Sequence, residues 1–336
     1  MINKQEKLET IKKIFSQNRG ILAADESIPT ATKRLASINL ESTPETRKKY
    51  REIFLTTPEI EKYISGVIFF DETFRQSVNE KIFPQFLAEK GIIPGIKVDK
   101  GVIEFPASPT EKITDGLIGL PERMAEYYAL GARFAKWRAI ITIGEGIPTD
   151  ACIQKNAEIL AEYAKDCIEV NIVPIIEPEV LLDGDHTIAK SEEVTTKTLQ
   201  VVFQNLKNLQ IPLDEVILKT SMVIPGNKSG EPMDSNKIAE ATVRCLRASV
   251  PNELGGVVFL SGGQTPIQAT ENLNVIAKLG PFPWPLSFSY ARALQGPSLK
   301  IWQGKDENIP VAQAEFIKRL KLNSAAVKGV YDAAME

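Results

Sequence analysis

The stretch Glu215-Val-Ile-Leu-Lys-Thr-Ser221 is a short apolar run that closes on a lysine and two small polar residues. It belongs to a set of eight short apolar or β-branched runs, several of which end in a charged or small polar residue. Segments with helical spacing lie between the runs, and this alternation predicts right-handed βαβ units. Eight such units match a closed (β/α)8 TIM barrel better than an open doubly wound sheet. The predicted strands are Gly20–Ala24, Gly66–Phe70, Ile92–Val98, Ala139–Ile143, Ile172–Ile176, Val216–Leu218, Gly256–Leu260 and Leu286–Tyr290.

The segments between the strands are rich in Ala, Leu, Glu or Lys and are bounded by turn residues, which predicts helices. The clearest are Pro121–Lys136, Asp150–Asn171, Ser191–Leu209, Asn236–Ser249 and Thr265–Lys278. We expect one α/β domain, residues 1–336, with the barrel at about residues 18–300, an N-terminal helical extension and a short helical tail at about 301–336. No GxGxxG follows the first strand and no GxxxxGK[ST] occurs, so neither a dinucleotide-binding fold nor a P-loop is indicated.

Composition narrows the class of partner and compartment. The 336-residue chain has a net charge of −3, which argues against nucleic acid or a membrane surface as a general partner. Residues 1–20 contain no uninterrupted apolar stretch, so no secretory signal is expected. The three cysteines lack metal-ligand spacing and are expected to be buried thiols in a reducing, cytoplasmic setting. With a single histidine, His186, a site of several histidine ligands is excluded and no metal centre is expected.

Lys219 is the first candidate for chemistry, because an ammonium at the end of a buried strand costs desolvation unless a partner or a reaction uses it. Lys97 and Lys136 occupy comparable strand contexts, so up to three ammonium groups are expected to converge. Crowded cations lower one another's pKa, and a neutral lysine amine attacks carbonyl carbons. A snorkelling surface lysine is the alternative interpretation.

Catalytic groups of such barrels lie at the carboxyl ends of the strands. Glu177 and Glu179 are two residues apart in an extended segment and are expected on one side, where one shuttles protons and the other fixes an ammonium. Solvated acids at a capped strand end are the alternative. Asp25 follows the first strand, either as a site carboxylate or as the N-cap of the next helix.

Two anion sites are indicated. Ser261 and Gly262 belong to a glycine turn after the seventh strand, where barrels often bind phosphate, and Arg292 follows the eighth strand. A second site is expected after the first strand, from Ser27, Thr30 and Arg34. Two phosphate sites flanking a lysine suit a bisphosphorylated sugar.

Taken together, these motifs resemble those of the class I, Schiff-base-forming fructose-bisphosphate aldolases, over about residues 10–325. The stretches that carry the resemblance are Gly20-Ile-Leu-Ala-Ala-Asp-Glu-Ser27, Gly95-Ile-Lys-Val-Asp-Lys-Gly101, Phe134-Ala-Lys-Trp-Arg138, Ile172-Val-Pro-Ile-Ile-Glu-Pro-Glu179, Asp183-Gly-Asp-His186, Leu218-Lys219, Phe259-Leu-Ser-Gly-Gly-Gln264 and Phe288-Ser-Tyr290.

The resemblance implies a role for each catalytic residue. Lys219 would form an iminium with the substrate ketone, and Glu177 would be the general acid and base, with Lys136 assisting. Glu179 would orient the lysines, and Asp25 would take the proton of the C4 hydroxyl. The implied substrate-binding residues are Lys97, Arg138, Ser261, Gly262, Ser289, Arg292, Ser27, Thr30 and Arg34.

The implied reaction is the reversible cleavage of fructose 1,6-bisphosphate to dihydroxyacetone phosphate and glyceraldehyde 3-phosphate, in glycolysis and gluconeogenesis. It needs no metal or other cofactor, and the family's quaternary state implies a homotetramer. No nucleic-acid or membrane partner is expected.

Three stretches and the C-terminal segment depart from the family pattern. Thr220-Ser221 stands where Pro-Asn is usual after the lysine, Ala291 replaces a glycine before the arginine, and Ile28-Pro29-Thr30 replaces a more flexible stretch. Preference between bisphosphate and monophosphate substrates is therefore open. Many members carry a terminal tyrosine that handles the C3 proton; here Tyr331 or another group is expected to do so, or turnover slows at that step.

Three alternatives remain at this point. A transaldolase-like transferase also uses a central lysine and acids, but does not need two phosphate sites. A non-catalytic binding or scaffold protein on the same fold is the second. A metal-dependent aldolase is the third, and the single histidine argues against it.

Overall fold

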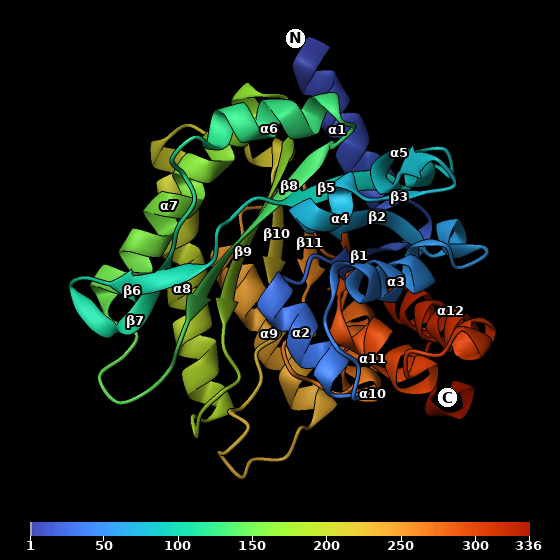
Figure 1. The fold of residues 1–336 in the computed structure, drawn as a ribbon. Coiled ribbons are helices and arrows are strands. Elements are labelled where there is room, and N and C mark those ends of the chain that lie inside the picture. The colour runs from blue at the N-terminus through green and yellow to red at the C-terminus, as the bar shows by residue number, and fades with distance from the viewer. Residues whose placement is uncertain (1) are drawn as a thin grey trace.

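The computed structural model describes residues 2–336, and its centre is a closed barrel of eight parallel strands (Figure 1). Each strand pairs with its neighbours in chain order, and β1 pairs with β12 to close the ring. The (β/α)8 prediction is confirmed. The barrel strands are β1 (Gly20–Ala24), β2 (Ile64–Phe69), β5 (Ile93–Lys97), β8 (Phe134–Ile141), β9 (Val173–Val180), β10 (Ile217–Thr220), β11 (Gly256–Phe259) and β12 (Leu286–Tyr290).

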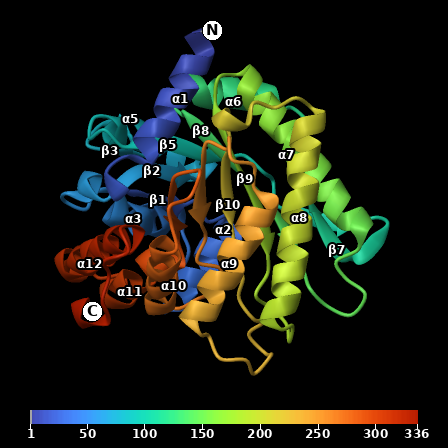
Figure 2. The same ribbon diagram turned by 180° about the vertical axis from the view of Figure 1, so that it is seen from behind.

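Helices surround the barrel, and Figure 2 shows α8 and α9 side by side on the side hidden in Figure 1. The larger helices are α2 (Ile28–Ala36), α3 (Pro44–Leu55), α6 (Leu120–Ala129), α7 (Asp150–Glu169), α8 (Ile188–Asn208), α9 (Ser235–Ser249), α10 (Pro266–Lys278), α11 (Arg292–Trp302) and α12 (Ile309–Val327). Among residues 2–336, no helix combines the length and apolar character needed to cross a membrane.

Short strands, helices and 3-10 turns lie between the larger elements, and the sequence did not predict them. They are the hairpins β3 (Ser77–Val78) with β4 (Lys81–Ile82) and β6 (Val102–Phe105) with β7 (Ser108–Thr114), the helices α4 (Asp71–Arg75) and α5 (Phe83–Ala88), and the 3-10 turns η1 (Ser16–Asn18), η2 (Ile60–Lys62), η3 (Leu213–Glu215), η4 (Asp306–Asn308) and η5 (Ala333–Met335).

Several predicted boundaries are shifted. β9, predicted over Ile172–Ile176, runs from Val173 to Val180, so Glu177 and Glu179 lie inside the strand. The largest shift is at β8. The helix expected over Pro121–Lys136 ends at Ala129, and β8 begins at Phe134 instead of Ala139. Gly131 has a φ of +109°, which ends the helix and turns the chain into the strand. Lys136 therefore lies inside a strand of the barrel.

The N-terminal helix α1 (Ile2–Ile14) lies at the amino ends of the strands. Ile11 and Ile14 are buried in the same cluster as inward-facing residues of the strands, such as Ile175. The ring of Phe15 sits against Gly256, where an added Cβ would lie 2.2 Å from it. Apolar side chains thus close this end of the barrel.

Inside the barrel, side chains form layers because alternate residues of each strand point inward. Phe134 fills the lower layer, and an added Cβ at Gly95 would lie 2.2 Å from its ring. Lys136 and Arg138 follow at steps of two along the same inward row of β8. The interior therefore changes from apolar at the amino ends to charged at the carboxyl ends.

Candidate active site

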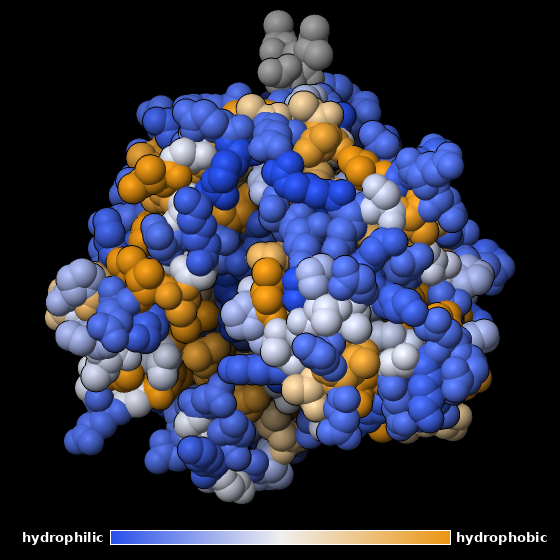
Figure 3. All heavy atoms as spheres, in the orientation of Figure 1, coloured by the Kyte–Doolittle hydropathy of each residue, from blue (hydrophilic) through white to orange (hydrophobic). Residues whose placement is uncertain are grey.

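A cavity of about 1030 Å³ opens at the carboxyl ends of the barrel strands. Figure 3 shows a hollow near the centre of this face, with hydrophilic residues in its depth. All fourteen residues singled out from the sequence line this cavity: Asp25, Ser27, Thr30, Arg34, Lys97, Lys136, Arg138, Glu177, Glu179, Lys219, Ser261, Gly262, Ser289 and Arg292.

Glu177 lies between two lysines at the floor of the cavity. Its Oε1 is 3.1 Å from Nζ of Lys219, and its Oε2 is 3.0 Å from Nζ of Lys136. Lys136 also lies 2.8 Å from Oδ2 of Asp25. The side chains of the two lysines and Glu177 are no more than 5% exposed, so water screens these ion pairs little. Three neighbouring strands and the end of β1 supply the four groups.

The charges in this cluster set one another's protonation. Burial alone would raise the pKa of Glu177, but the ammonium groups of Lys136 and Lys219 outweigh it and hold that pKa below its ordinary value. The pKa of Asp25 lies well below its usual range for the same reason. Burial lowers the pKa of Lys136, but the carboxylates of Asp25 and Glu177 raise it by more than burial lowers it. The pKa of Lys136 therefore lies above its ordinary value. The expectation that crowded cations lower one another's pKa is therefore wrong for Lys136, because carboxylates separate the lysines.

The upper rim carries two further ion pairs. Nζ of Lys97 lies 2.6 Å from Oδ1 of Asp99, and Nε of Arg138 donates to Oε2 of Glu179. Glu179 was expected to orient the lysines, but its ion pair among the described residues is with Arg138. Asp99 lines the cavity and was missed, although its position two residues after Lys97 on an extended segment could have revealed it.

The open alternative for Asp25, a helix N-cap, is wrong, because the N-cap of α2 is Ser27. Pro29 stands in the first turn of that helix, where its missing N–H costs nothing. The departure at Ile28-Pro29-Thr30 is therefore a regular helix start. The hydroxyl oxygens of Ser27 and Thr30 lie 3.1 Å apart at this end of the cavity.

The glycine turn after β11 forms the other end of the cavity. Gly262 and Gly263 have φ values of +41° and +87°, in the region that favours glycine. Leu182 packs on Gly263, where an added Cβ would lie 2.4 Å from Cδ2 of the leucine. The buried hydroxyl of Ser289 has no hydrogen-bond partner among residues 2–336, which leaves it for a ligand in the cavity.

The remaining departures from the family pattern have local explanations. Ala291 has a φ of −110°, so a glycine is not required there. Ser221 donates to the carbonyl of Val180 at 2.9 Å and ties the end of β10 to β9. Tyr331 is buried, donates to Glu336 at 3.0 Å and is not among the residues that line the cavity.

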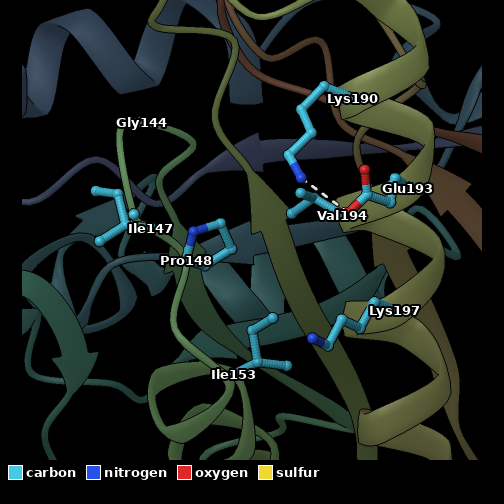
Figure 4. A pocket seen from close by; sticks show the side chains of 9 residues that line it. Gly144, Ile147, Pro148, Ile153, Lys190, Glu193, Val194 and Lys197 are labelled. Atoms are coloured by element: carbon cyan, nitrogen blue, oxygen red, sulfur yellow. Dashed lines mark hydrogen bonds and ion pairs between the residues drawn. The ribbon is translucent and has the colours of Figure 1, made fainter.

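A second hollow, of about 310 Å³, lies between the β8–α7 loop and α8 (Figure 4). Its charged groups already have partners: Lys190 lies 2.8 Å from Glu193, and Lys197 pairs with Asp150 at 2.5 Å. None of the fourteen predicted site residues lines it.

The three cysteines are buried and unpaired, as predicted, and none lines the large cavity. His186 is also buried, and burial lowers its pKa.

Comparison with known proteins identifies the family. A family model described as class-I fructose-bisphosphate aldolase matches residues 6–336. The chain is 49% identical over 323 residues to a probable fructose-bisphosphate aldolase class 1 of Xylella fastidiosa (strain 9a5c), which covers 96% of this chain and 97% of the relative. It is 47% identical over 320 residues to fructose-bisphosphate aldolase 4, cytosolic, of Arabidopsis thaliana, covering 95% and 81% of the two chains. A structure of fructose-bisphosphate aldolase from Plasmodium falciparum, in complex with TRAP and a small molecule inhibitor, superimposes with a TM-score of 0.97 at 44% identity, over 99% of this chain and 97% of that one. The chain therefore belongs to the class I fructose-bisphosphate aldolase family.

Proposed function

We propose that this aldolase cleaves fructose 1,6-bisphosphate reversibly through an iminium on Lys219. The observation that carries the proposal is Glu177 between Nζ of Lys219 and Nζ of Lys136, at 3.1 and 3.0 Å. Glu177 is placed to take a proton from the Lys219 ammonium, and the resulting amine attacks C2 of the ketone. The same carboxyl then returns a proton to the carbinolamine hydroxyl, which leaves as water.

Asp25 is the proposed base for bond cleavage. It takes the proton of the C4 hydroxyl, the C3–C4 bond breaks, and the electron pair moves into the iminium to give an enamine and glyceraldehyde 3-phosphate. Lys136 stabilises the ionised form of Asp25 at 2.8 Å. Protonation of the enamine at C3 and hydrolysis release dihydroxyacetone phosphate. The iminium is itself the electron sink, so the proposed reaction uses no metal ion or other cofactor.

The two ends of the cavity are proposed to hold the two phosphates. Ser261, Gly262, Ser289 and Arg292 suit the phosphate on C1, because the glycine turn offers backbone N–H groups and the arginine a fork of donors. Ser27, Thr30 and Arg34 suit the phosphate on C6. Lys97 and Arg138 line the wall between, with Glu179 holding the guanidinium of Arg138.

We also propose that residues 1–336 form a single domain and that the enzyme acts in the cytoplasm as a homotetramer. The cytosolic relative from Arabidopsis supports the location. Gel filtration with light scattering tests the oligomeric state directly.

The decisive experiment is borohydride reduction of the protein with dihydroxyacetone phosphate in the presence of EDTA, followed by peptide mass mapping. A reduced adduct on Lys219 is expected. An adduct on another lysine, or none, would remove Lys219 from its role. Cleavage of fructose 1,6-bisphosphate without an acceptor aldehyde separates the aldolase from a transaldolase-like enzyme.

A further inference from the structure

Arg34 is held by three acceptors that all contact one nitrogen. Its Nη1, which carries two hydrogens, lies within hydrogen-bond distance of Oε1 of Glu26, of the hydroxyl oxygen of Tyr50 at 2.8 Å and of Oε1 of Gln295. No hydrogen-bond partner of Nε or Nη2 occurs among the described residues. The side chain is 15% exposed and lines the cavity. One edge of the guanidinium is thus anchored, and the rest remains for an anion.

The anchoring side chains come from three separate elements. Glu26 follows β1, Tyr50 lies on α3, and Gln295 lies on α11, three residues after Arg292. The hydroxyl of Tyr50 lies 3.1 Å from Oε1 of Gln295 and 3.3 Å from Oε1 of Glu26, so the three holders also contact one another.

Tyr50 and Gln295 are fully buried and do not line the cavity. Any effect they have on binding therefore passes through the cavity residues that they hold, namely Arg34, Glu26 and Ala23. Both are neutral, so neither offsets the charge of the guanidinium, which forms an ion pair with the carboxylate of Glu26. Burial also raises the pKa of Tyr50, which keeps its hydroxyl neutral. A fixed guanidinium loses less conformational freedom when it binds an anion.

We propose that Tyr50 and Gln295 are positioning residues that aim Arg34 at the phosphate on C6 and thereby set the preference for bisphosphate over monophosphate substrates. This inference rests on the proposed function and deepens it. Because Gln295 and Arg292 share α11, the Arg34–Gln295 contact also fixes the spacing between the two phosphate-binding ends.

The test compares ligands with and without the distal phosphate. Binding of hexitol 1,6-bisphosphate, hexitol 1-phosphate and dihydroxyacetone phosphate is measured by calorimetry for the wild type, Tyr50→Phe and Gln295→Met. We expect the Kd for the bisphosphate to rise about tenfold in both variants, the loss typical of a hydrogen bond to a charged group. The Kd values for the two monophosphates should not change, and KM for fructose 1,6-bisphosphate should rise with kcat retained.

Tyr163→Phe is the matched control. Its hydroxyl is also buried and donates to a backbone carbonyl, that of Ile175, at 3.4 Å. This variant should bind all three ligands like the wild type. Gln295→Met keeps the proposal testable if Tyr50→Phe does not fold.

A second experiment adds Tyr50→Phe to the Arg34→Met variant. In that background Tyr50→Phe should have no further effect on bisphosphate binding. Equal weakening of all three ligands by Tyr50→Phe, or a full effect without Arg34, would overturn the proposal. The hexitol phosphates have no ketone, so their binding is independent of the Schiff base. Failure of borohydride trapping on Lys219 would therefore count against the proposed function alone.

Discussion

Nζ of Lys219 lies 3.1 Å from Oε1 of Glu177, and both groups are buried on adjacent strands of the barrel. The proposed acid and the proposed nucleophile are therefore in contact in the structure. Their charges are also linked, because the ammonium of Lys219 is one of the cations that lower the pKa of Glu177. In the proposed mechanism Lys219 becomes part of a neutral carbinolamine and that contribution is lost, so we expect Glu177 to become easier to protonate at the step where a proton donor is required.

Lys219→Met should raise the pKa of Glu177, because one of its two nearest cations is removed. The pKa is measured by isotope-edited infrared spectroscopy of the carboxyl during a pH titration. The same variant should lose about 10⁴-fold or more in kcat and form no borohydride adduct. An unchanged pKa would mean that Lys136 and Arg138 set the charge of Glu177 without Lys219.

Lys136→Met should destabilise the protein, because the buried Glu177 and the largely buried Asp25 lose their shared cation. We expect a loss of about 3–5 kcal/mol in the free energy of unfolding, measured by denaturant titration. Lys81→Met is the control, since it removes an exposed ion pair with Glu89 and should have little effect. A similar loss of unfolding free energy in both variants would show that burial does not strengthen the ion pairs of Lys136.

The site carboxylates also predict how stability depends on pH. The pKa values of Asp25 and Glu177 are lower in the folded state than in the unfolded chain. Their contribution is therefore present above about pH 4, near the unfolded values, and is lost as pH falls through the folded ones. Lys136→Met should reduce this acid dependence. Urea titrations between pH 7 and pH 3 measure how the free energy of unfolding depends on pH. The same dependence in the variant and the wild type would argue against a contribution from Asp25 and Glu177.

Gly263→Ala should weaken phosphate binding. Its φ of +87° disfavours alanine, and the added Cβ would lie 2.4 Å from Leu182. Gly230→Ala is a matched control, because Gly230 has a φ of +76° but nothing within 4 Å of its Cβ. Both should lose about 1–2 kcal/mol of stability from backbone strain. Only Gly263→Ala should raise the Kd for dihydroxyacetone phosphate, and equal Kd values for the two variants would exclude a role for this turn.

The thiols should not react in the native protein. Burial raises the pKa of Cys152 to about 12 and that of Cys245 to about 11, and Cys167 is shifted in the same direction. Titration with a thiol reagent at pH 8 should detect no thiol until denaturant is added, and then all three. Rapid labelling of native protein, located by mass mapping, would identify a site that opens in solution.

Some strands and site residues could be predicted from the sequence because the local residue pattern agrees with the position of the segment in the fold. β1 and β12 were predicted with their observed ends. β1 is a short apolar run that ends before Asp25, and β12 alternates larger residues with Ser287 and Ser289. β8 was misplaced because its inward row carries Lys136 and Arg138, which obscure the alternation of a strand. The partners of Arg34 were missed because Gln295 is 261 positions away, and no local pattern indicates that contact. Asp99 was missed because Lys97 alone was singled out at the end of that strand.

The ring of Phe134 occupies the space that side chains at Gly95 and Gly66 would need, with an added Cβ at 2.2 and 3.0 Å from it. These three positions share one volume at the base of the barrel, below Lys136. A larger residue at position 95 would therefore require a smaller one at position 134. Such a paired change would alter the packing directly below Lys136, although neither Gly95 nor Phe134 lines the cavity.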